Sequence, residues 1–363
     1  MRHLSVPRQT TQRWVSLCRD EGWLADTGVA ALDEERRGVP LLSHAPSEED
    51  PVWEGHVHVE HQPPNPSPVH WTDRLPAQLR TLPSSIWPSA YEIQGDVLMV
   101  KVEGSAEEHQ LAMAKAMLEQ LPNVRLVCAD SGVSGDFRVR DLRVLASRDG
   151  TLSTQTRVRE SGVSIWVDPG EVYFSARLST QRAETCHELQ SFSDRLGRSL
   201  VVADPYAGVG PAFASLLQDE GLVGGILAGD LNPTAVVLLQ RNIEHWSAKR
   251  QHPLNPCMLL CEDARTWGLR PELAGQADVL LVNLPHDSLD HLPSLMPVLR
   301  PSGEVLVRGW AIVERTSLNE QRARLESAVK QAGGESISVR VDEVKGFSSS
   351  KCFIVFQSTF TRK

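Results

Sequence analysis

The chain has 363 residues, of which 37 are Lys or Arg and 46 are Asp or Glu, giving a formal net charge of −9. This balance excludes a protein that coats nucleic acid through charge alone, and a hydrophobic share of 41% excludes a disordered chain. The length predicts two or three domains. The six cysteines lack the spacing of a disulfide scaffold, and no apolar run approaches the roughly 18 residues of a membrane span. We therefore expect a cytoplasmic protein with reduced cysteines and no membrane segment.

Two segments of different composition precede the rest of the chain. Residues 1–46 carry apolar side chains at helical spacing, among them Trp14, Leu17 and Cys18, and predict a small N-terminal module. Residues 47–88 are rich in proline and histidine, a composition that disfavours continuous regular structure. We therefore predict a linker over 47–88.

The next segment, residues 89–190, mixes strand and helix patterns. Residues 91–100 predict a strand, a Gly95-Asp96 turn and a second strand. A helix over 107–121 and a strand over 124–128 follow, and later stretches are again extended. This order predicts an α+β middle domain.

Residues 191–363 change to a regular alternation of apolar strands and amphipathic helices. The strands are predicted at 200–203, 225–228, 279–282 and 304–307, and such near-continuous apolar runs indicate a parallel sheet covered on both faces. A helix over 318–332 and two final strands follow. The predicted fold class is α/β, Rossmann-like, with the antiparallel final strand that is typical of methyltransferase sheets.

A glycine-containing turn follows the first of these strands. Glycines at such a turn let the backbone approach a ligand, although the same pattern also occurs in plain tight connections. The turn contains five candidate cofactor-binding residues: Asp204, Tyr206, Ala207, Gly208 and Gly210.

Polar residues also follow three further strands, at 225–228, at about Cys261 and at 279–282, where ligands of open α/β sheets bind. Asp230 could accept the hydroxyls of a ribose, Asp263 could bond an adenine amino group, and Asn283 would lie beside a reacting methyl group. An acid after the second strand also suits a nicotinamide enzyme. The remaining candidates of these turns are their neighbours Leu231, Asn232 and Ala264.

The turn after the strand at 279–282 discriminates between these cofactors. Asn283-Leu284-Pro285 is similar to the Asn/Asp-Pro-Pro-aromatic motif of amino-group methyltransferases, with leucine in the middle and no aromatic residue. It favours S-adenosylmethionine, and hence a class I S-adenosylmethionine-dependent methyltransferase fold. No residue spacing predicts a metal site.

Taken together, these motifs resemble the archaeal and eukaryotic tRNA (guanine(37)-N1)-methyltransferase family and the related wybutosine-pathway tRNA-modifying transferases. The resemblance is carried by the glycine turn, by Asp230-Leu231-Asn232-Pro233 and by Asn283-Leu284-Pro285. Upstream, residues 135–140 resemble the family's Gly-Glu-Phe-Arg-Val-Arg, and residues 160–178 resemble the segment before its catalytic helix.

This resemblance implies methyl transfer to N1 of guanine 37, next to the tRNA anticodon, by a monomer. The N-terminal module would contact the tRNA elbow and the middle domain the anticodon stem-loop. Arg140 would orient the target guanine, and Asn283 with Pro285 would shape its pocket. Between Ser134 and Arg182 there are eight arginines against six acids, a composition suited to phosphate and base contacts. The implied tRNA-binding residues are Arg138, Arg140, Arg177 and Arg182.

One position departs from the family pattern. Where the family carries a glutamate general base, this chain has Gln181, and an amide cannot accept the guanine proton. Three alternatives remain: Glu184 takes the proton, Asp136 takes it, or Gln181 only orients a guanine that loses its proton to water. We expect Gln181, Glu184, Asp136 and Arg140 to converge on one pocket.

Two other functions remain open. A wybutosine-pathway transferase would move the aminocarboxypropyl group of the same cofactor, or methylate carbon. A catalytically impaired relative would only bind tRNA.

Overall fold

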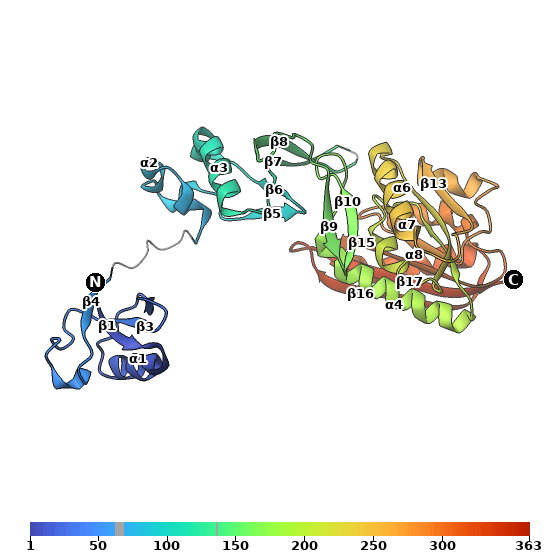
Figure 1. Ribbon diagram of the computed structural model, residues 1–363. Helices are drawn as coiled ribbons and strands as arrows, with labels where there is room; N and C mark the ends of the chain where they lie inside the picture. The colour runs from blue at the N-terminus through green and yellow to red at the C-terminus, as the bar shows by residue number, and fades with distance from the viewer. Residues whose placement is uncertain (62–68, 136) are drawn as a thin grey trace. The chain divides into compact units, whose positions relative to one another are not determined.

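The computed structural model describes residues 1–61, 69–135 and 137–363, and the chain forms two compact units, Met1–Arg74 and Leu75–Lys363 (Figure 1). Within the described ranges, no helix is long and apolar enough to cross a membrane.

The first unit is a four-stranded antiparallel sheet packed against one helix. Its strands run in the order β2-β3-β1-β4, and α1 (Thr11–Asp20) buries Trp14 against Trp53, with ring centroids 6.3 Å apart. The strands are β1 (Arg2–Pro7), β2 (Ala30–Ala31), β3 (Arg36–Pro40) and β4 (His58–Glu60).

This unit extends beyond residue 46, where the sequence predicts a linker to begin. Trp53 lies in the short helix η2 (Pro51–Trp53) and is fully buried, and β4 pairs with β1 through Leu4 and His58. Burial of one large aromatic side chain therefore outweighs the proline-rich composition. Short helices also form within residues 69–88, and they are η3 (Trp71–Arg74), α2 (Ala77–Arg80) and η4 (Ser84–Ile86).

The second unit begins with a mixed four-stranded sheet in the order β5-β6-β7-β8. Its β6 and β7 are parallel, and the other pairs are antiparallel. The elements are β5 (Tyr91–Gln94), β6 (Val97–Val100), η5 (Gly104–His109), α3 (Gln110–Gln120), β7 (Leu126–Ser134) and β8 (Val139–Ser147). This sheet with one helix has the α+β character expected of the middle segment.

A hairpin and a long helix connect this sheet to the larger one. Ile165 and Val167 of the hairpin are fully buried and pack, with Leu189 and Phe192 of the helix, into the core of the larger sheet. The elements are β9 (Thr156–Glu160), β10 (Val163–Val167), η6 (Ala176–Leu178) and α4 (Ser179–Leu196).

The larger sheet has seven strands in the order β13-β12-β11-β14-β15-β17-β16. Strands β11 to β15 are parallel, whereas β17 is antiparallel to both its neighbours. The strands are β11 (Leu200–Asp204), β12 (Val223–Asp230), β13 (Cys257–Cys261), β14 (Val279–Val282), β15 (Gly303–Glu314), β16 (Gly334–Gly346) and β17 (Lys351–Arg362).

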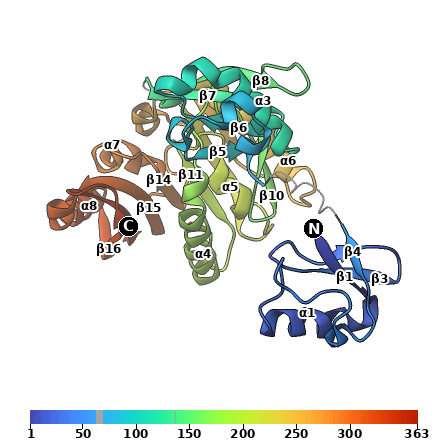
Figure 2. The same ribbon diagram turned by 90° about the vertical axis from the view of Figure 1, so that its left-hand side faces the viewer.

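Helices cover both faces of this sheet, as Figure 2 shows for α4 and α8. Val202 faces the core beneath α4, α5 and α6, whereas Ala203 faces the core beneath α7 and α8, because successive strand residues point to opposite faces. The helices are α5 (Pro211–Leu216), α6 (Pro233–Ser247), η7 (Ala264–Leu269), α7 (Ser288–Leu295), η8 (Met296–Val298), η9 (Arg315–Ser317) and α8 (Leu318–Gln331).

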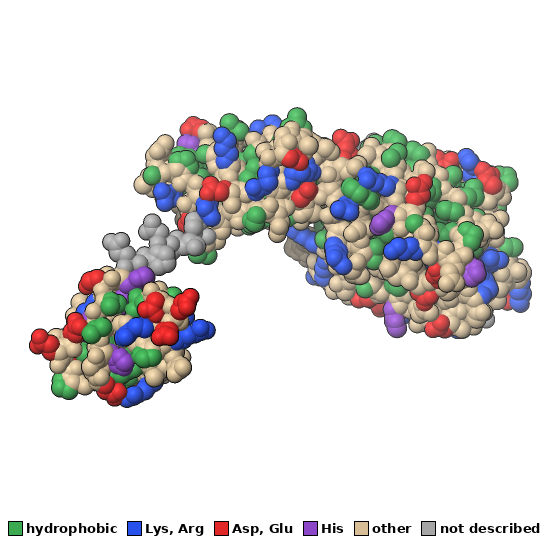
Figure 3. All heavy atoms as spheres, in the orientation of Figure 1, with side chains coloured by type: hydrophobic (Ala, Val, Ile, Leu, Met, Phe, Trp, Pro, Cys, Tyr) green, Lys and Arg blue, Asp and Glu red, His purple; other side chains and the backbone are tan. Residues whose placement is uncertain are grey.

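The strand order reverses direction between β11 and β14. The chain leaves β11 toward β12 and β13 on one side and reaches β14 and β15 on the other, so the loops at this point diverge and leave a crevice. Figure 3 shows basic and acidic side chains intermixed on the visible face of this unit. A crevice of this kind, rather than a broad charged surface, is therefore where a ligand is expected.

Candidate active site

A cavity of about 320 Å³ lies at the carboxyl ends of β11, β12, β13 and β14. It brings together all the cofactor-binding candidates named from the sequence except Gly210. Side chains of α4 and of the β7–β8 turn also line it, through Gln181, Phe137 and Arg138. One pocket therefore receives residues from both sheets of the second unit.

The backbone of the β11–α5 turn follows a path that its glycines allow. Gly208 and Gly210 have φ angles of 56° and 80°, in the left-handed region that side chains disfavour. A Cβ atom on Gly210 would lie 2.5 Å from Cδ1 of Leu239, so this glycine packs beneath the turn instead of lining the cavity. Pro211 then starts α5, where its fixed φ is suitable.

Two buried carboxyl groups form the inner wall of the pocket. Asp204 is 1% exposed and accepts a hydrogen bond from the backbone N–H of Tyr206 at 3.1 Å. Burial raises the pKa of Asp204 to about 7, and the nearby charge of Asp230 adds to this effect. Asp230 accepts the backbone N–H groups of Gly208 and Asn232, both at 2.9 Å, and burial also raises its pKa. This wall favours a positively charged ligand.

Two further polar residues predicted to bind the cofactor, Asp263 and Asn232, already have partners within the protein. Asp263 lines the pocket but forms an ion pair with Arg265, with Nη2 and Oδ2 2.5 Å apart, and these hydrogen bonds lower its pKa. Asn232 caps α6 by accepting the backbone N–H of Thr234 at 2.9 Å, so its side-chain oxygen has a structural role. Sequence reasoning assigned these side chains to a ligand and missed their internal partners.

Asn283, Leu284 and Pro285 all line the pocket, as the resemblance implies for Asn283 and Pro285. The Asn283 side chain forms a hydrogen bond with the Asp204 carboxyl group. Hydrogen bonds of the Ser288 hydroxyl hold this turn against β15. The hydroxyl accepts the Leu284 N–H at 3.1 Å and donates to the Trp310 carbonyl of β15 at 2.9 Å.

Where α4 lines the pocket, Gln181 presents a buried amide. The residue is 7% exposed, and its Oε1 atom has no hydrogen-bond partner within the described residues. One turn later, Thr185 lines the pocket and donates its hydroxyl hydrogen to the Gln181 carbonyl at 2.8 Å. The buried Arg308 of β15 donates from Nε to the Thr185 hydroxyl at 3.0 Å. These bonds hold the first turns of α4 against the sheet.

Glu184 does not line the pocket, contrary to our expectation. Its side chain is 52% exposed and lies 3.9 Å from Nη2 of Arg308. In a helix the residue four positions on from Gln181 lies closest to its face, so Thr185 takes the inward position. Asp136, the other expected proton acceptor, lies outside the described residues.

Arg140 also lies outside the main pocket. Its guanidinium group bonds Glu92 at 2.7 Å and Asp130 at 2.6 Å, and with Arg177 it lines a neighbouring cavity of about 190 Å³. The two cavities share Arg138, Tyr173, Phe174 and Ser175. Of the two arginines in residues 135–140, Arg138, with a φ of 53° in the β7–β8 turn, is the one that lines the main pocket.

Arg182 lines the pocket but is held internally. Its Nε and Nη2 atoms bond the two Glu160 oxygens at 2.6 and 2.5 Å.

Tyr173, 44% exposed, and Trp310 are aromatic lining residues that the sequence reasoning did not select. His291 also lines the pocket, and its Nδ1 atom forms a 2.7 Å hydrogen bond with the Tyr206 hydroxyl. Within the described ranges, no cluster of three or more His, Cys, Asp or Glu residues could hold a metal ion.

Two family models match the chain. Residues 73–150 match the TYW2 N-terminal domain, and residues 156–337 match the TRM5/TYW2 methyltransferase domain.

Curated relatives match over part of their length. The chain is 29% identical over 208 residues to tRNA (guanine(37)-N(1))-methyltransferase Trm5b of Pyrococcus abyssi, covering 56% of each protein. It is 28% identical over 217 residues to Trm5b of Methanocaldococcus jannaschii, covering 60% of this chain and 57% of that protein. The chain therefore spans about half the length of these relatives in the matched regions.

Solved structures share the fold. Wild-type Trm5b from Pyrococcus abyssi aligns with a TM-score of 0.66 at 20% identity, covering 99% of each chain. The aTrm5 protein of an aTrm5–tRNALeu complex aligns at 0.69 and 17% identity, with 99% of each chain covered. TYW2 of P. horikoshii in complex with MeSAdo aligns at 0.60 and 16% identity, covering 78% of this chain and 96% of that one. They confirm the Rossmann-like methyltransferase fold, and the match over residues 156–337 shows that the chain belongs to the TRM5/TYW2 methyltransferase family.

Proposed function

We propose that this protein binds S-adenosylmethionine and transfers its methyl group to N1 of guanine 37 in tRNA. The observation that carries the proposal is a single pocket with two different ends. Asp204 and Asp230 form an acidic wall at the β11 and β12 ends, with the Asn283 side chain hydrogen-bonded to Asp204, whereas Gln181 of α4 contributes a buried amide to the lining. The names of the curated relatives, which are tRNA (guanine(37)-N(1))-methyltransferases, support it.

The pocket fits the proposed cofactor. Its volume of about 320 Å³ is in the range of small-molecule sites. Buried carboxylates with raised pKa values are stabilised by a cation, and S-adenosylmethionine is cationic at sulfur and at its amino group. The open glycine turn allows close backbone approach. When bound, this cofactor supplies an electrophilic methyl group on a sulfonium.

The chain's own residues would act on the guanine. Gln181 Oε1, buried and without a partner, is suited to accept a hydrogen bond from a guanine N–H. Arg138 would stabilise the negative charge that develops on O6 as N1 loses its proton. An amide cannot remove that proton, and Glu184 lies outside the pocket, so we propose that Gln181 orients the guanine while Asp136 or solvent accepts the proton.

The decisive experiment is methyl transfer to tRNA transcripts carrying guanine or adenine at position 37, read by mass spectrometry of nucleosides. We expect 1-methylguanosine from the first transcript and no methylated nucleoside from the second. Absence of 1-methylguanosine with saturating cofactor would overturn the proposal.

A variant tests the proton acceptor separately. Gln181→Glu places a carboxylate at the pocket, and a positioned base contributes about 10²- to 10⁴-fold. We expect a faster single-turnover rate and a shallower rise of rate with pH than in the wild type. An unchanged rate and pH profile would show that position 181 does not face the guanine N1.

The match of residues 73–150 to the TYW2 N-terminal domain favours one second candidate, transfer of the aminocarboxypropyl group of the same cofactor to a wyosine-type precursor base. The same nucleoside analysis, with tRNA that carries the precursor base, separates the two reactions by the mass added.

A further inference from the structure

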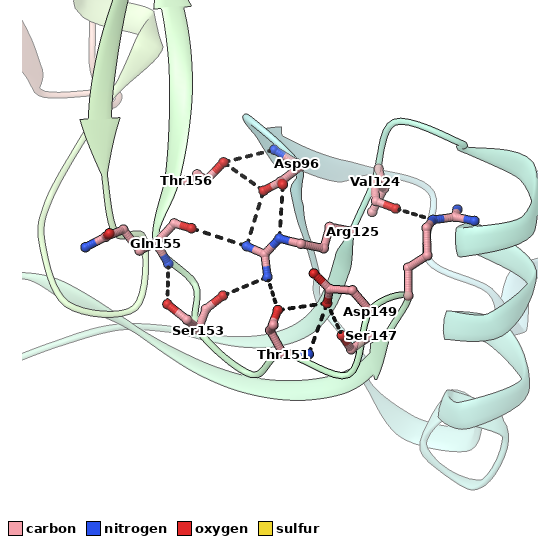
Figure 4. Close-up of polar contacts among 10 residues, drawn as sticks. Asp96, Val124, Arg125, Ser147, Asp149, Thr151, Ser153, Gln155 and Thr156 are labelled. Carbon is pink, nitrogen blue, oxygen red and sulfur yellow. Dashed lines mark hydrogen bonds and ion pairs between the residues drawn. The ribbon is translucent and has the colours of Figure 1, made fainter.

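One arginine lies where the two sheets of the second unit are joined. Arg125 directly precedes β7, and its side chain is 19% exposed. Its guanidinium group bonds Asp96 of the β5–β6 turn, with Nε–Oδ2 and Nη2–Oδ1 distances of 3.0 and 3.3 Å (Figure 4). A forked pair of this kind fixes orientation as well as distance.

The remaining N–H groups of Arg125 reach the segment that connects β8 to β9. Nη1 donates to the Thr151 hydroxyl at 2.6 Å and to the Ser153 carbonyl at 3.1 Å, and Nη2 donates to the Gln155 carbonyl at 3.2 Å (Figure 4). A guanidinium has five N–H donors, and here all five have acceptors. Arg125 therefore links the β5–β8 sheet to the segment that connects β8 to β9 and leads into the methyltransferase domain.

Asp96 makes the second link across the same junction. The Thr156 hydroxyl at the start of β9 donates to Asp96 Oδ1 at 2.8 Å and accepts the Asp96 backbone N–H at 3.2 Å. The adjacent Gly95 has a φ of 59°, and a Cβ atom there would lie 2.2 Å from the Thr156 hydroxyl oxygen. The turn and the strand therefore approach as closely as glycine permits. We call Asp96, Arg125, Thr151, Gln155 and Thr156 the junction cluster.

Further contacts lead from the junction cluster to the glycine turn between β11 and α5. Arg241 of α6 donates to Gln155 Oε1 at 3.0 Å, and its guanidinium carbon lies 3.4 Å from the centroid of the Trp166 ring. The next residue, Asn242, is fully buried and accepts the Trp166 N–H at 2.8 Å. It also donates to the Val209 carbonyl, in the glycine turn, at 2.9 Å.

The geometry of β7 makes this junction important for the active site. Strand β7 runs nine residues from the junction toward the turn that carries Phe137 and Arg138, a length of about 30 Å. A rotation of about 5° at the junction would displace that turn by about 2 to 3 Å. A misplacement of about 1 Å can cost about 100-fold in rate. Small errors at the junction are therefore magnified at the pocket.

We propose that Arg125 is a positioning residue. Through the junction cluster, it holds the β5–β8 sheet in the orientation that brings Arg138 to the active-site pocket. It touches no pocket residue itself. The catalytic consequence rests on the proposed function, whereas the orientation of the two sheets does not.

The test compares Arg125→Ala with a matched control, Arg148→Ala. Arg148 directly follows β8 of the same sheet, but its side chain donates only to carbonyls around the end of α3, to Val124 at 3.1 Å, to Leu121 at 3.3 Å and to Leu118. Both variants lose one arginine and several hydrogen bonds, but only the first loses bonds across the junction. Circular dichroism and thermal melts establish that both fold.

The first readout is the distance distribution between spin labels introduced as unnatural amino acids at the exposed positions Lys115 of α3 and Lys249 after α6. We expect Arg125→Ala to broaden this distribution and Arg148→Ala to leave it as narrow as in the wild type. Equal widths in Arg125→Ala and the wild type, or equal broadening in both variants, would overturn the proposal.

The second readout is single-turnover methyl transfer at saturating tRNA and cofactor. We expect a 10- to 100-fold slower rate for Arg125→Ala, with cofactor affinity by calorimetry within twofold of the wild type. Arg125→Lys should recover little, because an ammonium has three donors and no fork. A full rate in a variant with a broadened distribution would refute the positioning role. If the wild type itself transfers no methyl group, the proposed function fails while the distance measurement still decides the orientation.

If Arg125→Ala fails to fold, Thr151→Ala replaces it. This variant removes the hydroxyl that accepts Arg125 Nη1 at 2.6 Å and keeps the backbone carbonyls that Arg125 binds. We expect a smaller broadening in the same direction, and an unchanged distribution would count against the proposal.

Discussion

Replacing Asp204 with asparagine isolates the free energy of keeping a carboxyl group buried at the end of β11. The side chain is 1% exposed, and burial raises its pKa from 3.8 to about 7. The amide of asparagine is nearly the same size and can still accept the N–H of Tyr206, but it has no charge to bury. The variant therefore removes the titration and keeps the shape.

The sign follows from the direction of the shift. Because the folded-state pKa is raised, the folded protein binds this proton more tightly than the unfolded chain does. The associated stability is fully present below the ordinary value of 3.8 and is lost as the pH rises through about 7. At about 1.4 kcal/mol per pKa unit, a group with these two pKa values lowers the free energy of unfolding by about 3 kcal/mol between about pH 5 and about pH 8.5.

Urea unfolding of the full-length protein at these two pH values measures the effect. The free energy of unfolding of Asp204→Asn, relative to the wild type, should increase by about 3 kcal/mol from the lower pH to the higher. Asp141→Asn, which changes an exposed carboxyl group of the same unit, serves as the control and should show no comparable trend. A difference between Asp204→Asn and the wild type that stays constant with pH would refute the reasoning.

Three further predictions test other parts of the molecule. Asp230→Asn removes the charged acceptor of the Gly208 N–H and should weaken S-adenosylmethionine binding about 10- to 100-fold by calorimetry, and unchanged affinity would contradict the acidic-wall argument. Gly309→Ala would place a Cβ atom 2.1 Å from the Val282 carbonyl and should lower the free energy of unfolding by at least about 1 to 3 kcal/mol in urea, so a neutral result would contradict this close strand packing. Trp14→Ala should destabilise the first unit by about 3 to 5 kcal/mol, as measured by its own unfolding transition, while cofactor affinity stays unchanged; a fall in affinity would show that the units are coupled.

The parts of the site that the sequence could predict are those fixed by neighbours in the chain. Asp204, Asp230 and Asn283 each follow a short apolar run, and the carboxyl ends of adjacent parallel strands meet at one edge. Their convergence therefore follows from local patterns alone. The same holds for the glycine turn, whose positive φ angles require residues without a Cβ.

The parts that could not be predicted depend on partners distant in sequence. Arg140 is held by Glu92, 48 residues away, and by Asp130 across the β7–β8 ladder. No local pattern indicates which arginine of residues 135–140 has internal partners and which reaches the pocket. Trp53 likewise lies in a segment rich in proline, and it is buried because it packs against Trp14 in the core of the first unit.

The division of charge within the pocket links these observations to the proposed reaction. Among the described lining residues, the carboxyl groups all follow β11, β12 or β13, and they are Asp204, Asp230, Glu262 and Asp263. Gln181, on α4, contributes a neutral amide whose buried oxygen has no partner, an arrangement that costs about 1 to 3 kcal/mol unless a ligand donates to it. A cation at the acidic end and a neutral N–H donor at the amide satisfy both ends at once. Methyl transfer breaks the sulfur–methyl bond and forms the bond to N1, whose proton leaves the guanine, so the acidic end accounts for binding of the cofactor, whereas Arg138, which would stabilise the charge that develops on the guanine, acts on the reaction itself.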